Sequence, residues 1–124
     1  MRITESTENY MEAILILQQR NGAVRAVDIA HYFGFSKPTI SQYMKQYVQQ
    51  GLVEVDGNGH ITLTGEGRAI AEHTFERHRV ITSLFMALGV PEEIAREDAC
   101  KVEHDLSEDT FRCMKAHYMK HIQR

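Results

Sequence analysis

The sequence predicts a mainly α-helical chain, with a winged helix-turn-helix over residues 1–63 and an all-helical unit over residues 64–124. Two observations predict this order. In most of the chain apolar residues recur every three to four positions, as in amphipathic helices, whereas residues 52–63 alternate apolar and polar side chains, as strands do. A hydrophobic content of 43% in 124 residues is typical of a folded globular domain and argues against disorder or a disulfide scaffold.

Two helices are predicted at the start of the chain. The first covers residues 4–20, with Ser6 or Thr7 as its cap, and Gly22 ends it by supplying a left-handed turn. The second covers residues 26–33. Its predicted inner side consists of four apolar residues, Val27, Ile29, Ala30 and Phe33.

A third helix is predicted over residues 36–50. Ser36-Lys37-Pro38 favours a helix start, because a serine hydroxyl caps first-turn amides and proline near the first turn gives up no needed hydrogen bond. The predicted buried row of this helix is Ile40, Met44 and Val48.

A β-hairpin is predicted next, with strands over residues 52–55 and 60–63 joined by the turn Asp56-Gly57-Asn58-Gly59. Helix, helix, turn, helix and hairpin in this order are the elements of a winged helix-turn-helix. Three further helices are predicted after it: one over residues 64–88 capped by Thr64, one that opens at Pro91, and a last one capped by Ser107.

The third helix is the predicted DNA-reading element, because the second helix of a helix-turn-helix enters the major groove. Between Asp28 and Glu54 the chain carries two lysines and no acidic residue, so this segment suits phosphates. Lysine and hydroxyl side chains can contact phosphates, while Gln42 can pair with adenine. The predicted DNA-binding residues are Ser36, Lys37, Pro38, Thr39, Ser41, Gln42 and Lys45. The alternative interpretation of this face is an ordinary solvated helix surface.

A candidate metal site is predicted at Cys100-Lys101-Val102-Glu103-His104. On a helix, positions i, i+3 and i+4 share one face, so a thiolate, a carboxylate and an imidazole converge there. Asn9 and Glu12 form another i, i+3 pair in the first helix, and His78 lies midway along the long helix. Nitrogen, oxygen and sulfur donors together suit a borderline transition ion and not Ca²⁺ or Mg²⁺. Taken singly, each of these residues also fits a structural role.

The chain resembles the diphtheria-toxin-repressor family of iron- and manganese-dependent transcriptional repressors along essentially its whole length. The stretches that carry the resemblance are residues 7–12, Ser36 to Gln42, Leu63-Thr64-x-x-Gly67, Arg77-His78-Arg79 and Ala99-Cys100-x-x-Glu103-His104. The resemblance implies primary-site metal ligands at the positions of Asn9, Glu12, His78, Cys100, Glu103 and His104. It also implies the two-domain form of the family, without a C-terminal SH3-like domain.

Departures from the family pattern bear on the metal. The manganese branch of the family has Asp at the position of Asn9 and Glu at that of Cys100, whereas the iron branch has Met and Cys there. Cys100 is the softer donor and favours iron over manganese. The iron branch also carries an ancillary site, whose partners here would be Thr82 and Arg96, which cannot replace a carboxylate and an imidazole. We therefore expect no second site of that kind.

These features predict a metal-dependent regulator, a repressor of metal-uptake genes, in which Fe²⁺ or Mn²⁺ organises a homodimer for binding to double-stranded operator DNA. Zn²⁺, Co²⁺ or Ni²⁺ can occupy the same ligands in vitro. The metal would hold two recognition helices near one DNA turn apart, about 34 Å. The predicted pairing surface consists of Leu84, Phe85, Leu88, Phe111, Met114 and Tyr118, which could alternatively form a monomeric core.

Location and rival functions follow from what the sequence lacks. The first residues are polar, no run approaches the ~20 apolar residues of a membrane span, and two cysteines are too few for a disulfide framework, so we expect a cytoplasmic protein without a membrane partner. A metalloenzyme is the first alternative, but no His-Glu-x-x-His, nucleophile elbow or phosphate loop occurs, and we expect no catalysis. The others are a metal-independent winged-helix regulator and a protein-interaction module.

Overall fold

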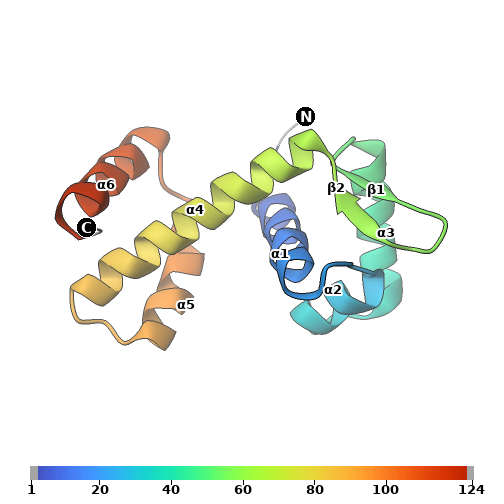
Figure 1. Ribbon diagram of the computed structural model, residues 1–124, viewed down its shortest axis with the longest axis horizontal. Coiled ribbons are helices and arrows are strands. Elements are labelled where there is room, and N and C mark those ends of the chain that lie inside the picture. Colours follow the sequence, from blue (N-terminus) through green and yellow to red (C-terminus); the bar gives the residue numbers. More distant parts are fainter. Residues whose placement is uncertain (1–2, 123–124) are drawn as a thin grey trace. The chain divides into compact units, whose positions relative to one another are not determined.

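The computed structural model describes residues 3–122, which divide into two compact units, one that ends at Glu72 and one that begins at His73 (Figure 1). The outer ends of the two predicted domains, residues 1–2 and 123–124, lie outside the described part of the chain. Six helices and one two-stranded sheet make up residues 3–122, so the predicted fold class is confirmed. None of these helices has the length and apolar character needed to cross a membrane.

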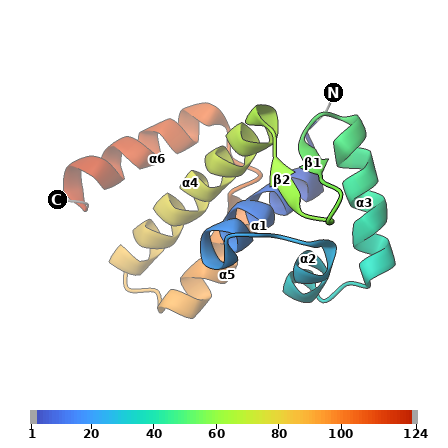
Figure 2. The ribbon, with the colours of Figure 1, turned by 45° about the vertical axis from the view of Figure 1, so that its right-hand side comes forward.

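The first unit contains a three-helix group and a hairpin (Figure 2). Its elements are α1 (Glu5–Asn21), α2 (Ala26–Phe33), α3 (Lys37–Gln49), β1 (Val53–Val55), β2 (Ile61–Leu63) and the beginning of α4 (Gly65–Ala87). The strands are antiparallel with Val53 opposite Leu63, and α2 packs against α3. This arrangement confirms the predicted winged helix-turn-helix.

Helix caps agree with the sequence at α3 but not at α1. The Ser36 hydroxyl accepts a hydrogen bond from the Thr39 amide at 3.3 Å, as predicted. The predicted cap of α1 at Ser6 or Thr7 is wrong, because the helix begins earlier and the Thr4 hydroxyl accepts from the Thr7 amide at 3.2 Å. Thr7 is instead a buried residue of the first turn.

Two predicted core positions face solvent. Val48 of α3 is 44% exposed, and Tyr47 is buried in its place. The reason is geometric: at 3.6 residues per turn, a residue seven positions after Ile40 returns close to the same face, whereas one eight positions later has rotated about 80° past it. Val27 of α2 is 54% exposed, since this two-turn helix buries only a narrow stripe that contains Ile29 and Ala30.

An aromatic cluster holds α1 against α2 and α3. The Tyr10 ring centroid lies 4.8 Å from that of Phe33 and 4.9 Å from that of Tyr43, and Tyr47 lies at 5.8 Å. Burial, followed by the neighbouring phenols of Tyr43 and Tyr47, raises the pKa of Tyr10 to about 12. These contacts fix the orientation of α3 within its unit.

The second unit consists of the remainder of α4 together with α5 (Glu92–Val102) and α6 (Glu108–His121). Its buried cluster draws one or two residues from each helix, namely Val80, Ile81, Ala99 and Phe111. Five residues of the predicted pairing surface, Leu84, Phe85, Phe111, Met114 and Tyr118, belong to this cluster or pack against it. The sixth, Leu88, is 81% exposed.

Candidate metal centre and nucleic-acid interface

The predicted metal pentad does not lie wholly on a helix. α5 ends at Val102, Glu103 is its C-cap, and His104 follows in a turn. Glu103 still has helical backbone angles and its amide donates to the Ala99 main-chain oxygen, so its side chain leaves from the last turn of α5, whereas His104 belongs to the turn that follows. Cys100 lies in the last turn of α5 and is exposed.

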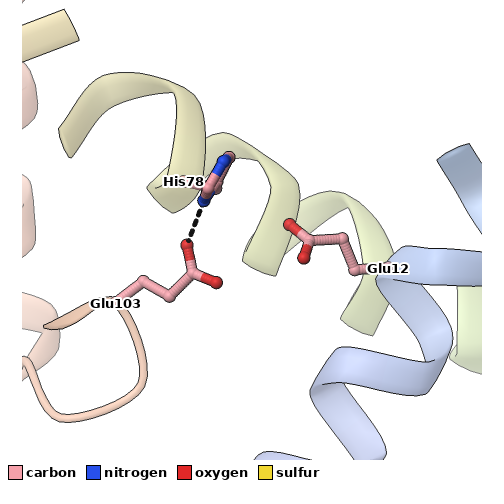
Figure 3. A group of neighbouring side chains, drawn as sticks. All are labelled: Glu12, His78 and Glu103. Atoms are coloured by element: carbon pink, nitrogen blue, oxygen red, sulfur yellow. Dashed lines mark hydrogen bonds and ion pairs between the residues drawn. The ribbon is translucent and has the colours of Figure 1, made fainter. Parts of the chain in front are cut away.

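Within the second unit, the Glu103 carboxylate lies beside two imidazoles. Its Oε2 is 3.0 Å from His78 Nδ1, the contact dashed in Figure 3, and its Oε1 is 3.4 Å from His104 Nε2. The Glu103 side chain is 0% exposed and that of His104 is 3% exposed. Removing a carboxylate from water costs free energy unless opposite charge or hydrogen bonds compensate it. A buried carboxylate beside two imidazoles is therefore a candidate for a binding site.

The turn that carries Glu103 and His104 is held by Arg77, which lies beside His78 in α4. Arg77 Nη1 donates hydrogen bonds to the main-chain oxygens of Glu103 at 3.0 Å and Leu106 at 2.8 Å. Its Nη2 donates to Glu108 Oε1 at 2.5 Å. The Arg77 guanidinium also lies 5.0 Å from the centroid of the Phe111 ring. A single buried side chain of α4 thus ties down both ends of residues 103–108.

Glu108 completes this arrangement from the first turn of α6. His73 Nε2 lies 2.7 Å from Glu108 Oε1, and this hydrogen bond, with that from Arg77, holds the pKa of the Glu108 carboxyl below its usual value. Neither Arg77 nor Glu108 has a role that the sequence predicted. Arg77 was named only as part of Arg77-His78-Arg79, one of the stretches that carry the family resemblance. Its contacts could not be predicted, because they join residues far apart in the sequence.

The other predicted ligands lie apart from this cluster in the sequence. Asn9 and Glu12 are one turn apart on α1, in the unit formed by residues 1–72. Glu12, which Figure 3 also draws, is buried, and Asn9 is half-buried.

The donors within the second unit fit a transition ion. Two imidazole nitrogens and a carboxylate, contributed by His78, His104 and Glu103, are the ligand types that Mn²⁺, Fe²⁺ and Zn²⁺ accept, and the thiol of Cys100 is the softest donor nearby in sequence. Hydrogen bonds from Arg77 to the main chain orient the turn that bears two of them.

The predicted DNA-reading face belongs to the first unit and is open to solvent. Ser36, Lys37, Pro38, Thr39, Gln42 and Lys45 are exposed, and Ser41 is half-buried. The hydroxyls of Ser36 and Thr39 lie 2.8 Å apart, so each already has a polar neighbour. α3 has no acidic residue in its first turn. A helix with this surface can approach a phosphate backbone without charge repulsion.

The wing carries further polar groups that the sequence analysis did not single out. In the turn between β1 and β2, Asp56 Oδ1 accepts hydrogen bonds from the amides of Asn58 and His60 at 2.8 and 2.9 Å. The amide of His60, followed by that of Asn58, holds the pKa of Asp56 below its usual value. Arg25 Nη2 lies 3.2 Å from His60 Nε2, which places a guanidinium next to the hairpin.

Comparisons with known proteins match both halves of the chain. Residues 2–61 match the family described as "Iron dependent repressor, N-terminal DNA binding domain". Residues 64–124 match the one described as "Iron dependent repressor, metal binding and dimerisation domain".

Curated relatives include a transcriptional regulator and an iron-dependent repressor. The chain is 36% identical over 117 residues to "Transcriptional regulator MntR" of Escherichia coli O6:H1, which covers 94% of this chain and 76% of the relative. It is 34% identical over 111 residues to "Iron-dependent repressor IdeR" of Mycobacterium leprae, covering 89% of this chain and 48% of the relative.

Solved structures agree with this fold. A "Manganese-dependent transcriptional repressor complex with manganese" has a TM-score of 0.80 at 27% identity, covering 89% of this chain and 51% of the other. The manganese regulator SloR has a TM-score of 0.78 at 24% identity, covering 96% and 55%, and supports the fold alone. The chain thus spans about three quarters of MntR and about half of IdeR and of these two solved chains.

Proposed function

This chain belongs to the iron-dependent repressor family, and from that premise we propose that it represses genes of metal uptake when Fe²⁺ or Mn²⁺ binds to it. The observation that carries the proposal is the buried Glu103 carboxylate between two imidazoles, in the part of the chain that matches the family's metal-binding domain. The curated relatives are named as a transcriptional regulator and an iron-dependent repressor.

We propose that residues 1–63 read DNA and that residues 64–124 bind metal and form the homodimer. The DNA-contacting residues would be Ser36, Lys37, Pro38, Thr39, Ser41, Gln42 and Lys45, which lie at or near the first two turns of α3. The exposed lysines would contact phosphates and position the helix, while Gln42 would contact base edges. Because genomic DNA is the proposed partner, we propose that this protein acts in the cytoplasm.

The proposed metal ligands are Asn9, Glu12, His78, Cys100, Glu103 and His104. When bound, the metal supplies positive charge that ties ligands from distant parts of the sequence together. Arg77 fixes the turn that presents Glu103, and His78 holds one oxygen of that carboxylate through its Nδ1 atom. Because the role of these groups is to bind and orient, we propose no catalytic activity for them.

The identity of the physiological metal is proposed from the donors. Cys100 favours Fe²⁺, whereas the oxygen donors Asn9, Glu12 and Glu103 suit Mn²⁺ as well. Both ions are therefore proposed as activators, with Zn²⁺, Co²⁺ and Ni²⁺ as substitutes in vitro.

Substitution of Glu103 tests the proposal. In Glu103→Gln, which retains the side chain's shape but removes its charge, we expect Fe²⁺ and Mn²⁺ no longer to strengthen operator binding. Gel-shift titrations with each ion under anaerobic conditions measure this response. Glu97→Gln is the matched control, because Glu97 is an exposed acid of the same helix and should respond as the unmodified chain does.

Two outcomes would contradict the proposal. If Fe²⁺ or Mn²⁺ still strengthens operator binding by Glu103→Gln as it does for the unmodified chain, Glu103 is not a metal ligand. Operator binding by the unmodified chain that ignores chelator would instead favour a metal-independent winged-helix regulator. Circular dichroism of both variants checks that the fold is retained.

A further inference from the structure

α6 carries a stripe of potential metal donors that the proposed function does not use. Cys113, His117 and His121 follow one another at intervals of four residues, and all three are exposed. Phe111 and Met114 of the same helix pack in the hydrophobic cluster of the second unit, whereas the three donors of the stripe are open to solvent.

The two imidazoles of this stripe already lie next to each other. The ring centroids of His117 and His121 are 4.5 Å apart, with an angle of 45° between the ring planes. Side chains at i and i+4 are neighbours on a helix, so small rotamer adjustments bring one nitrogen of each ring to a common ion. We propose that His117 and His121 form a second divalent-cation site, selective for ions that prefer imidazole: Zn²⁺, Ni²⁺ and Cu²⁺.

The position in the helix also favours a cation. His121 is the last residue of α6, where main-chain carbonyl groups without helical partners carry partial negative charge. A doubly charged ion held there by two neutral imidazoles interacts favourably with this end of the helix dipole.

The donor type separates this site from the one proposed for regulation. The affinity of imidazole ligands is lower for Mn²⁺ and Fe²⁺ than for Ni²⁺, Cu²⁺ and Zn²⁺. No carboxylate lies between His117 and His121 in the sequence to improve Mn²⁺ binding. The site therefore takes Zn²⁺, Ni²⁺ or Cu²⁺ and leaves Mn²⁺ to the carboxylate-containing cluster around Glu103. This inference does not depend on the proposed function.

Equilibrium dialysis of the full chain against Zn²⁺ and against Mn²⁺ tests the proposal, in the Glu103→Gln background so that the regulatory cluster does not mask the result. We expect His117→Ala and His121→Ala each to lose one bound zinc ion per chain in this background, and to leave Mn²⁺ uptake unchanged when they are made without Glu103→Gln. His31→Ala is the control, because His31 is an exposed histidine of α2. It should lose no zinc, and neither should Cys113→Ser, whose thiol lies eight residues from His121.

Binding by scattered histidines would overturn the proposal, and it would appear as an equal loss of zinc in His31→Ala. Unchanged zinc uptake in both His117→Ala and His121→Ala would also overturn it, as would a loss in Cys113→Ser without one in His121→Ala. As a second measurement, substoichiometric Cu²⁺ should selectively broaden the imidazole nuclear magnetic resonance signals of His117 and His121. His117→Ala and His121→Ala should also be made in the chain that retains Glu103. If these variants still bind operator DNA in a metal-dependent way, the site on α6 is distinct from the regulatory one.

Discussion

At the scale of single residues, the structure constrains the side chain most tightly at positions 103 and 67. Glu103 is a carboxylate without exposed surface, and the hydrogen bond between its Oε2 atom and His78 Nδ1 offsets part of the cost of burying it. Gly67 is required for a different reason: a Cβ atom on it would lie 2.0 Å from the main-chain oxygen of Leu52. That oxygen belongs to the backbone just before β1, which leaves no room for a side chain at the start of α4.

Substitution of Gly67 measures this close approach. Gly67→Ala should lower the free energy of unfolding by about 1–3 kcal/mol, because the backbone of either α4 or residue 52 must move. Urea denaturation followed by circular dichroism gives the value. Gly65→Ala is the control two residues earlier in the same helix, where an added Cβ meets nothing within 4 Å.

The control should behave in the opposite direction. Gly65 has no positive backbone φ, so alanine there should stabilise the chain by up to about 1 kcal/mol through a lower entropy of the unfolded state. Equal effects of the two substitutions would show that the contact with Leu52 does not limit position 67.

At the scale of elements, α4 does the most to organise the second unit. Its buried Arg77 reaches the main chain of residues 103 and 106 and the carboxylate of Glu108, so the turn between α5 and α6 is held by three hydrogen bonds from one side chain. Two of the acceptors are carbonyl groups that would otherwise need water or another donor. The same helix also supplies Val80 and Ile81 to the hydrophobic cluster.

Removing the guanidinium tests the importance of this turn. Arg77→Met keeps an unbranched side chain but removes every donor, and we expect the free energy of unfolding to fall by about 1–3 kcal/mol. Metal binding should weaken as well, since the turn that presents Glu103 and His104 is then free to change. Chemical denaturation and metal titration measure the two effects.

Arg112→Met is the matched control for this experiment. Arg112 pairs with Asp109 at 3.3 Å on the exposed surface of α6, and a surface ion pair of this kind contributes at most about 1 kcal/mol. An equal loss of metal affinity in both variants would argue against a specific effect of Arg77 on the turn.

At the scale of the whole molecule, charge is divided along the sequence. The chain has a net charge of −3, yet α3 and its flanks carry two lysines and no acid, whereas residues 92–109 carry eight acidic residues against two basic ones. An acidic segment suits cations and an acid-free helix suits phosphates. One chain can thus hold both functions, which match separate family domains over residues 2–61 and 64–124.

Coupling between these functions has a thermodynamic consequence. If Mn²⁺ or Fe²⁺ raises operator affinity by about 5–150-fold, corresponding to about 1–3 kcal/mol, operator DNA must raise the affinity for that ion by the same factor. Metal titrations with and without operator DNA measure this. Equal metal affinities in the two titrations would contradict metal-dependent repression, and DNA of unrelated sequence is the control.

The sequence alone was sufficient for the order of elements and for most of their ends. Alternation of side chains identified the hairpin, Gly22 ended α1 with a positive φ value, and Ser36 capped α3. These features are local, since they depend on residues within one or two turns of each other. The spacing of Cys100, Glu103 and His104 is equally local, and it marked them as candidate metal ligands.

Tertiary structure decided which of those residues are buried and what they contact. Val48 fits a four-residue repeat but faces solvent, because burial follows the helical angle and the packing partner and not the repeat alone. The hydrogen bond between His78 and Glu103 joins positions 25 residues apart in the sequence. The hydrogen bonds from Arg77 to residues 103, 106 and 108 join positions about 25 to 30 residues apart. Such contacts arise only when the helices pack, so no local pattern specifies them.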